Sequence, residues 1–448
     1  MDKKNFFIIV SSIIFVFSIL IVGIILGMKN SQIYVTFSSP LNNNIQTVKL
    51  NKGSTIDFNN YNETVEGYEF IGWYTSNTLE HKLNKNYIFT TNKTIYAGYS
   101  KIINIKEINN LKFTGIYSYT VVSDGIEKID SSHIKKLLDL GVKRLDLSNC
   151  SFKGNIINSK TFNNFNLKEV ILGKSNTIDS QAFYNCFELE SVICPDGLLF
   201  IKSKAFENCY NLKNIQFKYG LLELEENSIY GSDQLKEINL PSTVDNISPN
   251  FISNCKNLKN INVSTENNKY TSENGILYSK DKSKIIKFPE KKEIDYILPI
   301  EVVEILDYAF YKSNIKSIEF NNNIKTIGNF SFYGCNNLKN IEFKDNNSYS
   351  LGNSVFENCE NLKNVKFNIG LNIIGDSVFK NDKNLETVEI LNSTNINYDK
   401  LTTIGNNLFY GCEKLKSFEI PSSVTTIGNN MFYECKLLES VLIAGNIK

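Results

Sequence analysis

Cysteine is the reactive residue type that recurs most regularly in this sequence of 448 residues. The chain has nine cysteines and only two histidines, His81 and His133. Thiolates could form disulfides or, together with histidines, hold a zinc ion, and zinc sites usually show C-x-x-C or Cys/His spacings. The sequence has no C-x-x-C pair, and an odd total leaves at least one cysteine unpaired. The spacing of the cysteines therefore does not predict a metal site.

Seven cysteines occupy one slot of an internal repeat, namely Cys186, Cys209, Cys255, Cys335, Cys359, Cys412 and Cys435. The same slot holds Ser232, Ser313 and Asp382 in other copies, so a small buried residue is sufficient there. We therefore expect reduced thiols in a core, with occasional bridging as the alternative. Cys150 and Cys194 lie outside the slot, and their redox state stays open.

Other catalytic patterns lack their essential members. The segment Gly173-Lys174-Ser175 looks like the end of a phosphate-binding loop, but Lys168 stands where its first glycine is required. No G-x-S-x-G or H-E-x-x-H motif occurs, and we expect His133 on the surface of a helix. With so little material for acid/base chemistry, the sequence predicts a protein that is not an enzyme and has no cofactor.

Amino-acid composition excludes two further classes of protein. Apolar residues make up 42% and aromatic residues 12% of the chain, which excludes a disordered protein. The 48 basic and 47 acidic side chains nearly cancel, and Arg144 is the only arginine. Lysine lacks the planar fork that reads guanine or phosphate in two contacts. We therefore expect no nucleic-acid partner.

The elements that could position any site begin with a hydrophobic segment. Residues 6–27 carry no charge, and at 1.5 Å per residue they would span roughly 33 Å as a helix. Lys3 and Lys4 precede this segment and Lys29 follows it, which predicts a cytoplasmic tail at 1–5, a transmembrane signal anchor and an extracellular bulk. The alternative is a cleaved signal and a secreted protein.

Residues 32–100 predict a small β domain. Short β runs are expected at 33–37, 48–58, 87–89 and 94–99. The segment Gly67-Tyr-Glu-Phe-Ile-Gly-Trp-Tyr74, with a V-T-F start and an I-Y-A end, resembles the internalin B-repeat (Listeria–Bacteroides repeat) family. The resemblance implies a β-grasp-like module that serves as a spacer or adhesive segment. Trp73, the only tryptophan, is expected to anchor the core, with a ligand-stacking platform as the alternative.

A repeat of 22 to 24 residues dominates residues 142–448, anchored on Phe183, Phe206, Ile229, Ile252, Phe310, Phe332, Phe356, Phe379, Phe409 and Phe432. Such a period is typical of leucine-rich repeats, whose units bury their apolar sides by stacking. We expect twelve or thirteen units in a β-solenoid of parallel strands joined by turns or short helical segments. Residues 101–141 are expected to form a linker and an N-terminal cap, with a short helix after Ser131 and Ser132.

The pattern I-G-x-x-A-F-x-x-C-x-x-L-x-x-I-x-(F/I)-P resembles the BspA-type leucine-rich repeat, a family of bacterial surface proteins. Copies include Ile327-Gly328 with Phe332 and Cys335, and the corresponding run from Ile427 to Cys435. Two spacings between consecutive anchors, Ile252 to Phe310 and Phe379 to Phe409, are longer than the repeat, and both agree with this resemblance. Residues 274–289 in the first resemble a hairpin insert of that family, and residues 392–399 in the second are an Asn-rich loop.

Two rows of side chains are candidate protein-binding surfaces. The expected strand face carries lysines and glutamates, with Lys316, Glu319, Lys339, Glu342, Glu389, Lys416 and Glu419 as candidates. Charge pairing between neighbouring strands is the alternative for this face. Beside the anchor residues runs a tyrosine row of Tyr184, Tyr230, Tyr311, Tyr333, Tyr410 and Tyr433. Tyrosine is common at interface hot spots, with stacked packing as the alternative.

These patterns predict a membrane-anchored bacterial surface protein that binds a protein or host-surface ligand through its repeats. Its membrane contact would be residues 6–27, and no metal is expected. A structural envelope or spacer protein without a specific ligand is the alternative function.

Overall fold

The computed structural model describes residues 31–61, 64–112, 115–344, 348–391 and 401–444. The predicted anchor at 6–27 and the Asn-rich loop at 392–399 lie outside these residues. Within the described part, no helix is long and apolar enough to cross a membrane. The described residues divide into two compact units, those up to Val122 together with Leu140–Leu145, and Ser123–Asp139 together with those from Asp146 onward.

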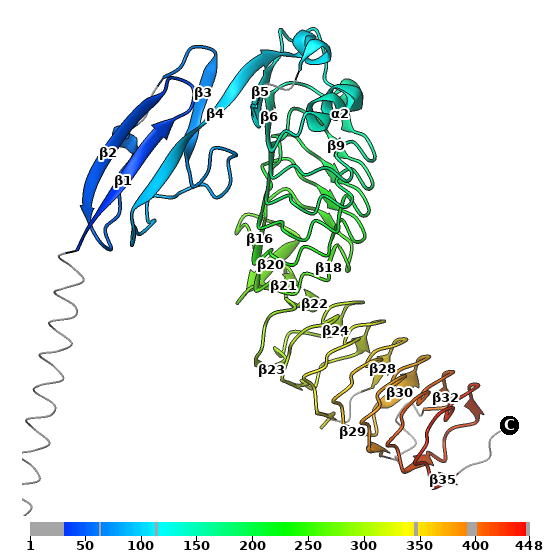
Figure 1. Cartoon of the computed structure of the whole chain (residues 1–448). Coiled ribbons are helices and arrows are strands. Elements are labelled where there is room, and N and C mark those ends of the chain that lie inside the picture. Colours follow the sequence, from blue (N-terminus) through cyan, green and yellow to red (C-terminus); the bar gives the residue numbers. More distant parts are fainter. Residues whose placement is uncertain (1–30, 62–63, 113–114, 345–347, 392–400, 445–448) are drawn as a thin grey trace, which may run out of the picture. The chain divides into compact units, whose positions relative to one another are not determined.

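The N-terminal unit contains five strands of a mixed β-sheet (Figure 1). They are β1 (Gln32–Ser39), β2 (Asn44–Asn51), β3 (Tyr68–Tyr74), β4 (Lys93–Asn104) and β5 (Ser118–Val122), with short 3-10 turns η1 (Phe58–Tyr61) and η2 (Ile105–Asn110). Strand β1 lies between an antiparallel β2 and a parallel β4, and β4 also pairs with β3 (antiparallel) and β5 (parallel). Two expectations were wrong here, because β2 starts earlier than residue 48 and ends at Asn51, and residues 87–89 contribute only a bridge through Phe89.

Trp73 lies in the core of this sheet, as predicted. Only 4% of its surface is exposed, and its ring meets Phe37 edge-on at 4.8 Å and Phe70 at 5.7 Å. A unit this small needs one large aromatic side chain to bury enough apolar area. The core reading of Trp73 is therefore confirmed.

The C-terminal unit is a solenoid of about 14 turns whose short strands stack in rows (Figure 1). The strand face consists of β6 (Arg144–Asn149), β8 (Glu169–Ile171), β10 (Ser191–Ile193), β13 (Asn214–Gln216), β16 (Glu237–Leu240), β19 (Asn260–Val263), β23 (Asp295–Ile297), β25 (Ser317–Glu319), β27 (Asn340–Glu342), β29 (Asn364–Phe367), β31 (Thr387–Ile390), β33 (Ser417–Ile420) and β35 (Ser440–Ile443). Wherever two of these strands pair in the array, they are parallel and in register, as between Ile341 and Val365.

A second row packs at another side of each turn. It consists of β7 (Ile156–Ile157), β9 (Thr177–Ile178), β11 (Phe200–Ile201), β14 (Glu223–Leu224) and β17 (Asn246–Ile247), and then of β22 (Lys284–Lys287), β24 (Glu304–Ile305), β26 (Thr326–Ile327), β28 (Tyr349–Leu351), β30 (Leu371–Ile374), β32 (Thr403–Ile404) and β34 (Thr426–Ile427). Three anchor segments form a small third row, β12 (Phe206–Glu207), β15 (Ile229–Tyr230) and β18 (Ile252–Ser253). The remaining short elements are helix α2 (Ser131–Asp139) and the 3-10 turn η3 (Lys153–Asn155).

The anchor residues form the core column that the repeat predicts. Phe310 stacks on Phe332 with ring centroids 4.6 Å apart, and Phe332 stacks on Phe356 at 5.4 Å. Most anchors also donate their backbone N–H to the residue before the next anchor, as from Phe332 to the carbonyl of Val355 at 2.9 Å. One turn therefore buries its apolar side only against the next turn.

The insert between Ile252 and Phe310 contains one more turn than expected. The hairpin predicted over 274–289 is β21 (Ile276–Ser279) with β22, which pair antiparallel from Tyr278 to Ile285. An additional strand, β20 (Tyr270–Glu273), pairs with β21 across Asn274 and Gly275, which both have positive φ. The second part of the insert returns to the array, because Phe288 stacks on Phe310 at 4.8 Å. Phe288 was missed as an anchor because Pro289 and Glu290 follow it in place of the usual motif.

A glycine column lets neighbouring turns approach closely. A Cβ on Gly375 would lie 2.5 Å from the carbonyl oxygen of Gly352, although φ of Gly375 is ordinary. Beside this column, Asn353 donates its N–H to Oδ1 of Asn329 at 2.7 Å, and Asn329 donates to Asp307 at 2.6 Å. In the I-G-(N/D) part of the repeat, the glycine thus allows the close approach of two turns. The Asn or Asp that follows it accepts the N–H of the equivalent residue in the next turn.

Candidate interaction surface

The strand face of the later turns carries three parallel lanes of exposed side chains. A basic lane has Lys316, Lys339, Lys363 and Lys416, and an acidic lane has Glu319, Glu342, Glu389 and Glu419. All eight of these side chains are exposed, so the structure places the predicted charges on one accessible face. Lys366 interrupts the acidic lane between Glu342 and Glu389, a position that sequence reasoning did not single out.

The charge-pairing interpretation holds for part of this face, because Lys363 of the basic lane pairs with Glu386 of the next turn at 4.0 Å. Among the described residues, Lys316, Lys339 and Lys416 form no ion pair. Lysine and glutamate of one turn are three residues apart, which is about 10 Å along a strand. The ion pairs that do form use other neighbours, such as Lys344 with Glu319 at 3.2 Å and Lys213 with Glu190 at 2.6 Å.

Between the charged lanes runs a lane of amides and hydroxyls whose hydrogen bonds are satisfied internally. Asn364 donates from Nδ2 to Oδ1 of Asn340 at 2.8 Å, and Thr387 donates to Oδ1 of Asn364 at 2.8 Å. These hydrogen bonds between successive turns hold the uncharged side chains of this middle lane in place. The exposed lysines of the basic lane without an ion pair among the described residues, Lys316, Lys339 and Lys416, remain available for a partner.

Ring stacking joins the tyrosines of this row in two pairs and does not run through the whole row. Tyr311 stacks on Tyr333 with centroids 5.2 Å apart, and Tyr410 stacks on Tyr433 at 4.9 Å. Tyr433 is 54% exposed, whereas Tyr184, Tyr230, Tyr311, Tyr333 and Tyr410 are half-buried. Burial raises the pKa of Tyr311 to about 12, and the neighbouring Tyr333 adds to this shift. Four of the six tyrosines therefore stack in two pairs, which fits the packing interpretation of this row.

Two aromatic residues that the sequence did not flag widen the row. Tyr308 and Phe330 stack at 5.1 Å, and each also lies against the row, Tyr308 on Tyr311 and Phe330 on Tyr333. Both have left-handed backbone conformations, with φ of 58° and 54°, where other turns carry Asn, Ser, Gln or Lys. Bulky residues are rare in that conformation. An aromatic residue two positions before the anchor would have been the sequence signal.

The cysteine slot is a hydrogen-bonding position in the core. Six of its seven thiols donate to the carbonyl of the anchor one turn earlier, as from Cys335 to Phe310 at 3.0 Å and from Cys412 to Phe379 at 3.0 Å. All nine cysteines are free, and only Cys435 is not fully buried. Burial raises the pKa of the Cys335 thiol to about 12. The expectation of reduced core thiols is confirmed for the slot, and Cys150 and Cys194 are also free and buried.

Three acidic or basic side chains of the solenoid are at most 3% exposed, namely Lys287, Glu290 and Asp382. Burial lowers the pKa of Lys287, whose Nζ donates to the carbonyl of Tyr308 at 3.0 Å, and raises the pKa of Glu290. Burial also raises the pKa of Asp382, which occupies the cysteine slot and accepts the N–H of Cys359 at 2.7 Å. Each of these groups lies against backbone within the turns, so we assign them structural roles.

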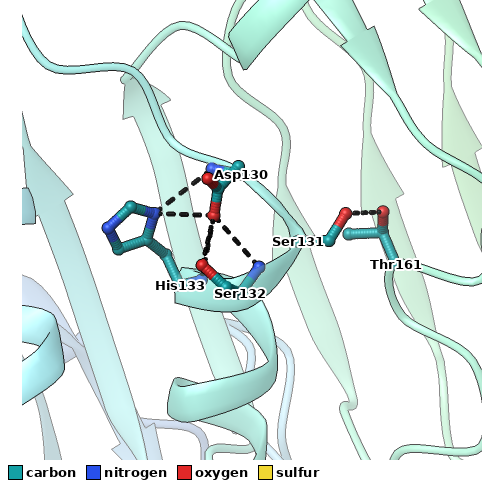
Figure 2. A network of polar contacts seen from close by, with 5 residues as sticks. All are labelled: Asp130, Ser131, Ser132, His133 and Thr161. Carbon is teal, nitrogen blue, oxygen red and sulfur yellow. Dashed lines mark hydrogen bonds and ion pairs between the residues drawn. The ribbon is translucent and has the colours of Figure 1, made fainter.

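A polar network at the start of α2 brings together Ser, His and Asp side chains (Figure 2). Asp130 Oδ1 lies 2.9 Å from His133 Nδ1, and Ser132 Oγ donates to the same oxygen at 2.6 Å. The serine contacts the aspartate and not the histidine, so no nucleophile–base pair forms. Asp130 Oδ1 also accepts the N–H groups of Ser132 and His133, at 3.0 and 3.3 Å.

This network is therefore a helix cap, with two corrections to the sequence reading. The N-cap is Asp130, one residue before the predicted Ser131. His133 is only 8% exposed and is not a surface residue, because its ring folds back to Asp130. The Ser131 hydroxyl instead meets Thr161 at 2.9 Å and joins α2 to the array (Figure 2). In the described part of the chain, no three His, Cys, Asp or Glu residues cluster as a metal site would require.

Comparison with known proteins identifies relatives for the array. The pattern of the BspA type leucine-rich repeat region matches six times, over residues 155–279, 284–400 and 391–448. A leucine-rich repeat protein from Eubacterium ventriosum is 25% identical over 72% of this chain and 84% of its own, with a TM-score of 0.59. No curated protein matches the chain significantly.

Two further crystal structures are similar to this chain at lower scores. The pneumococcal vaccine antigen PcpA is 20% identical over 80% of this chain and 76% of its own, with a TM-score of 0.49. A leucine rich cell surface protein from Faecalibacterium prausnitzii is 22% identical over 86% of this chain and 94% of its own, with a TM-score of 0.48.

Proposed function

Because the chain belongs to the BspA-type leucine-rich repeat family, we propose that it is a bacterial surface protein that recognises a protein ligand through the strand face of its solenoid. The observation that carries this proposal is the separation of the two charged lanes. Lys316, Lys339 and Lys416 are exposed and form no ion pair in the described part of the chain. Unpaired charges in ordered rows suit a partner of complementary charge.

A binding assay with two matched variants tests this proposal. One variant neutralises the lanes, with Lys316→Gln, Lys339→Gln, Glu342→Gln and Glu389→Gln. The control neutralises two exposed charges elsewhere, with Lys325→Gln and Glu266→Gln. Beads coated with the full chain should bind cultured epithelial cells, and the lane variant should lose at least tenfold in bound beads while the control binds normally. Equal binding by all three proteins would favour the alternative, a spacer without a specific ligand.

Attachment to the cell membrane is the second part of the proposal. It rests on the uncharged segment 6–27 with lysines on both flanks, which would place the β domain and the solenoid outside the cell. The β domain at 32–100 would then be a B-repeat-like stalk, supported by its Gly67–Tyr74 motif. Protease added to intact cells should remove everything beyond Lys29. Full protection of the solenoid would contradict this orientation.

A further inference from the structure

The β-sheet of the N-terminal unit has one protected edge and one open edge. On the protected side, β3 carries a register shift at Gly72, and Leu83 donates its N–H to the carbonyl of Trp73 at 2.8 Å. On the open side, β2 keeps an unbroken register with β1 from Asn44 to Asn51. In the described part of the chain, no strand pairs with the outer side of β2.

The backbone groups on that open edge can be assigned. Lys52 donates its N–H to the carbonyl of Ser31 at 2.8 Å, so residue 52 faces β1. In an antiparallel pair this direction alternates from one residue to the next. The N–H and C=O groups of Ile45, Thr47 and Lys49 therefore point away from β1 and find no strand partner in the described residues. A row of such groups is a template for adding a strand.

The side chains of β2 do not block this edge. Strand β2 has no proline and no bulge, and Lys49 is its only charged residue. Ile45 is 68% exposed, so its side chain does not shield the edge. Edges that must stay unpaired normally carry several charges, a proline or a bulge. Strand β2 is thus much less protected than β3.

We propose that β2 pairs with β2 of a second copy of this chain, antiparallel and about a two-fold axis at Thr47. This register places Lys49 opposite Ile45 of the second copy, so no like charges face each other. It also extends an existing contact, because Thr47 Oγ1 already lies 3.2 Å from Thr36 Oγ1 of β1. Thr47 would meet its own copy and continue this threonine ladder across the axis. The pairing would add about six backbone hydrogen bonds, and a two-fold contact needs only this one surface.

Disulfide trapping of the full chain in mild detergent tests the geometry. Hydrogen-bonded antiparallel residues have Cα atoms about 5.5 Å apart, within the range that a disulfide bridges. Oxidation of the Thr47→Cys variant should therefore give a covalent dimer on a non-reducing gel. The control is Tyr34→Cys on β1, which is 49% exposed but would lie about 20 Å from its counterpart, across three strand spacings and offset by four residues along the strand. Equal dimer yields from the two variants and the unsubstituted chain would overturn the proposal.

A second variant distinguishes this edge from any other self-association. Thr47→Pro removes an N–H that points away from β1, so the sheet keeps its own hydrogen bonds. Sedimentation should show a twofold drop in mass from dimer to monomer with an unchanged thermal midpoint. A dimer that persists in Thr47→Pro, or an unsubstituted chain that is monomeric at every concentration, would overturn the pairing.

Discussion

The thiol of Cys359 donates a hydrogen bond to the carbonyl oxygen of Phe332, with 3.1 Å between sulfur and oxygen. The same carbonyl also accepts the N–H of Cys335, so the thiol occupies its second acceptor position. The two serines of this slot behave differently from the thiols, since the Ser313 hydroxyl contacts Cys335 Sγ at 3.4 Å in place of an anchor carbonyl. The Ser232 hydroxyl has no hydrogen-bond partner among the described residues, and its shorter C–O bond explains the lost reach.

Cys359→Ser should therefore destabilise the solenoid although serine occurs naturally in the slot. A buried hydroxyl without a partner costs about 1–3 kcal/mol. The urea midpoint of the Cys359→Ser variant should fall below that of the unsubstituted chain. Cys435→Ser is the control, because Cys435 is only half-buried and should shift the midpoint less. An unchanged midpoint for Cys359→Ser would show that the carbonyl does not require the thiol.

The thiols should also differ in reactivity. Cys435 is half-buried and its pKa is raised to about 11, whereas the other eight are buried. A brief treatment of the native chain with N-ethylmaleimide should label Cys435 first, because access decides the rate when no thiol is activated. Mass spectrometry of the peptides identifies the label. Early labelling of Cys335, or any disulfide in the untreated chain, would contradict the packing of the slot.

Asp382 should make the stability of the solenoid depend on pH. Its folded-state pKa is raised by burial, so the folded chain holds this proton more tightly than the unfolded chain. The resulting stability is present below the unfolded value near 4 and is lost as the pH rises through the folded value. Every tenfold increase in the affinity for this proton corresponds to about 1.4 kcal/mol of that stability.

Asp382→Asn should therefore raise the urea midpoint at neutral pH and change it little at pH 4. The difference between the two midpoints, measured from pH 4 to pH 8, isolates Asp382 from Glu290, whose pKa is raised in the same direction. A difference that stays constant with pH would mean that Asp382 keeps an ordinary pKa.

Gly375→Ala should be strongly destabilising for a purely steric reason. The added Cβ would lie 2.5 Å from the carbonyl oxygen of Gly352, so the two turns would have to move apart. Overpacking of this kind costs typically about 1–3 kcal/mol. The matched control is Thr326→Ala at an exposed position of the second row, which should shift the urea midpoint by less than a third as much. Equal shifts would show that the column tolerates a methyl group.

The sequence by itself determined the repeat, and with it most of the solenoid. The 22 to 24 residue period, the apolar pair in each strand and the recurrent anchor are local patterns, and stacking is the only way in which such units can bury their apolar sides. It also placed Trp73 in a core and the charged lanes on the strand face. Where the motif is replaced, as at Phe288-Pro289, the pattern failed and one turn was missed.

Only the tertiary structure decided which side chains contact each other. The period does not say that Lys316 and Glu319 are too far apart to pair, because that depends on the direction of the strand between them. Nor does it show that Asp130 rather than the Ser131-Ser132 pair caps α2, that His133 folds inward, or that six thiols of the cysteine slot donate to the carbonyl of the anchor one turn earlier. These contacts join residues of different turns, or residues on either side of a backbone bend, and spacing along the chain does not fix them.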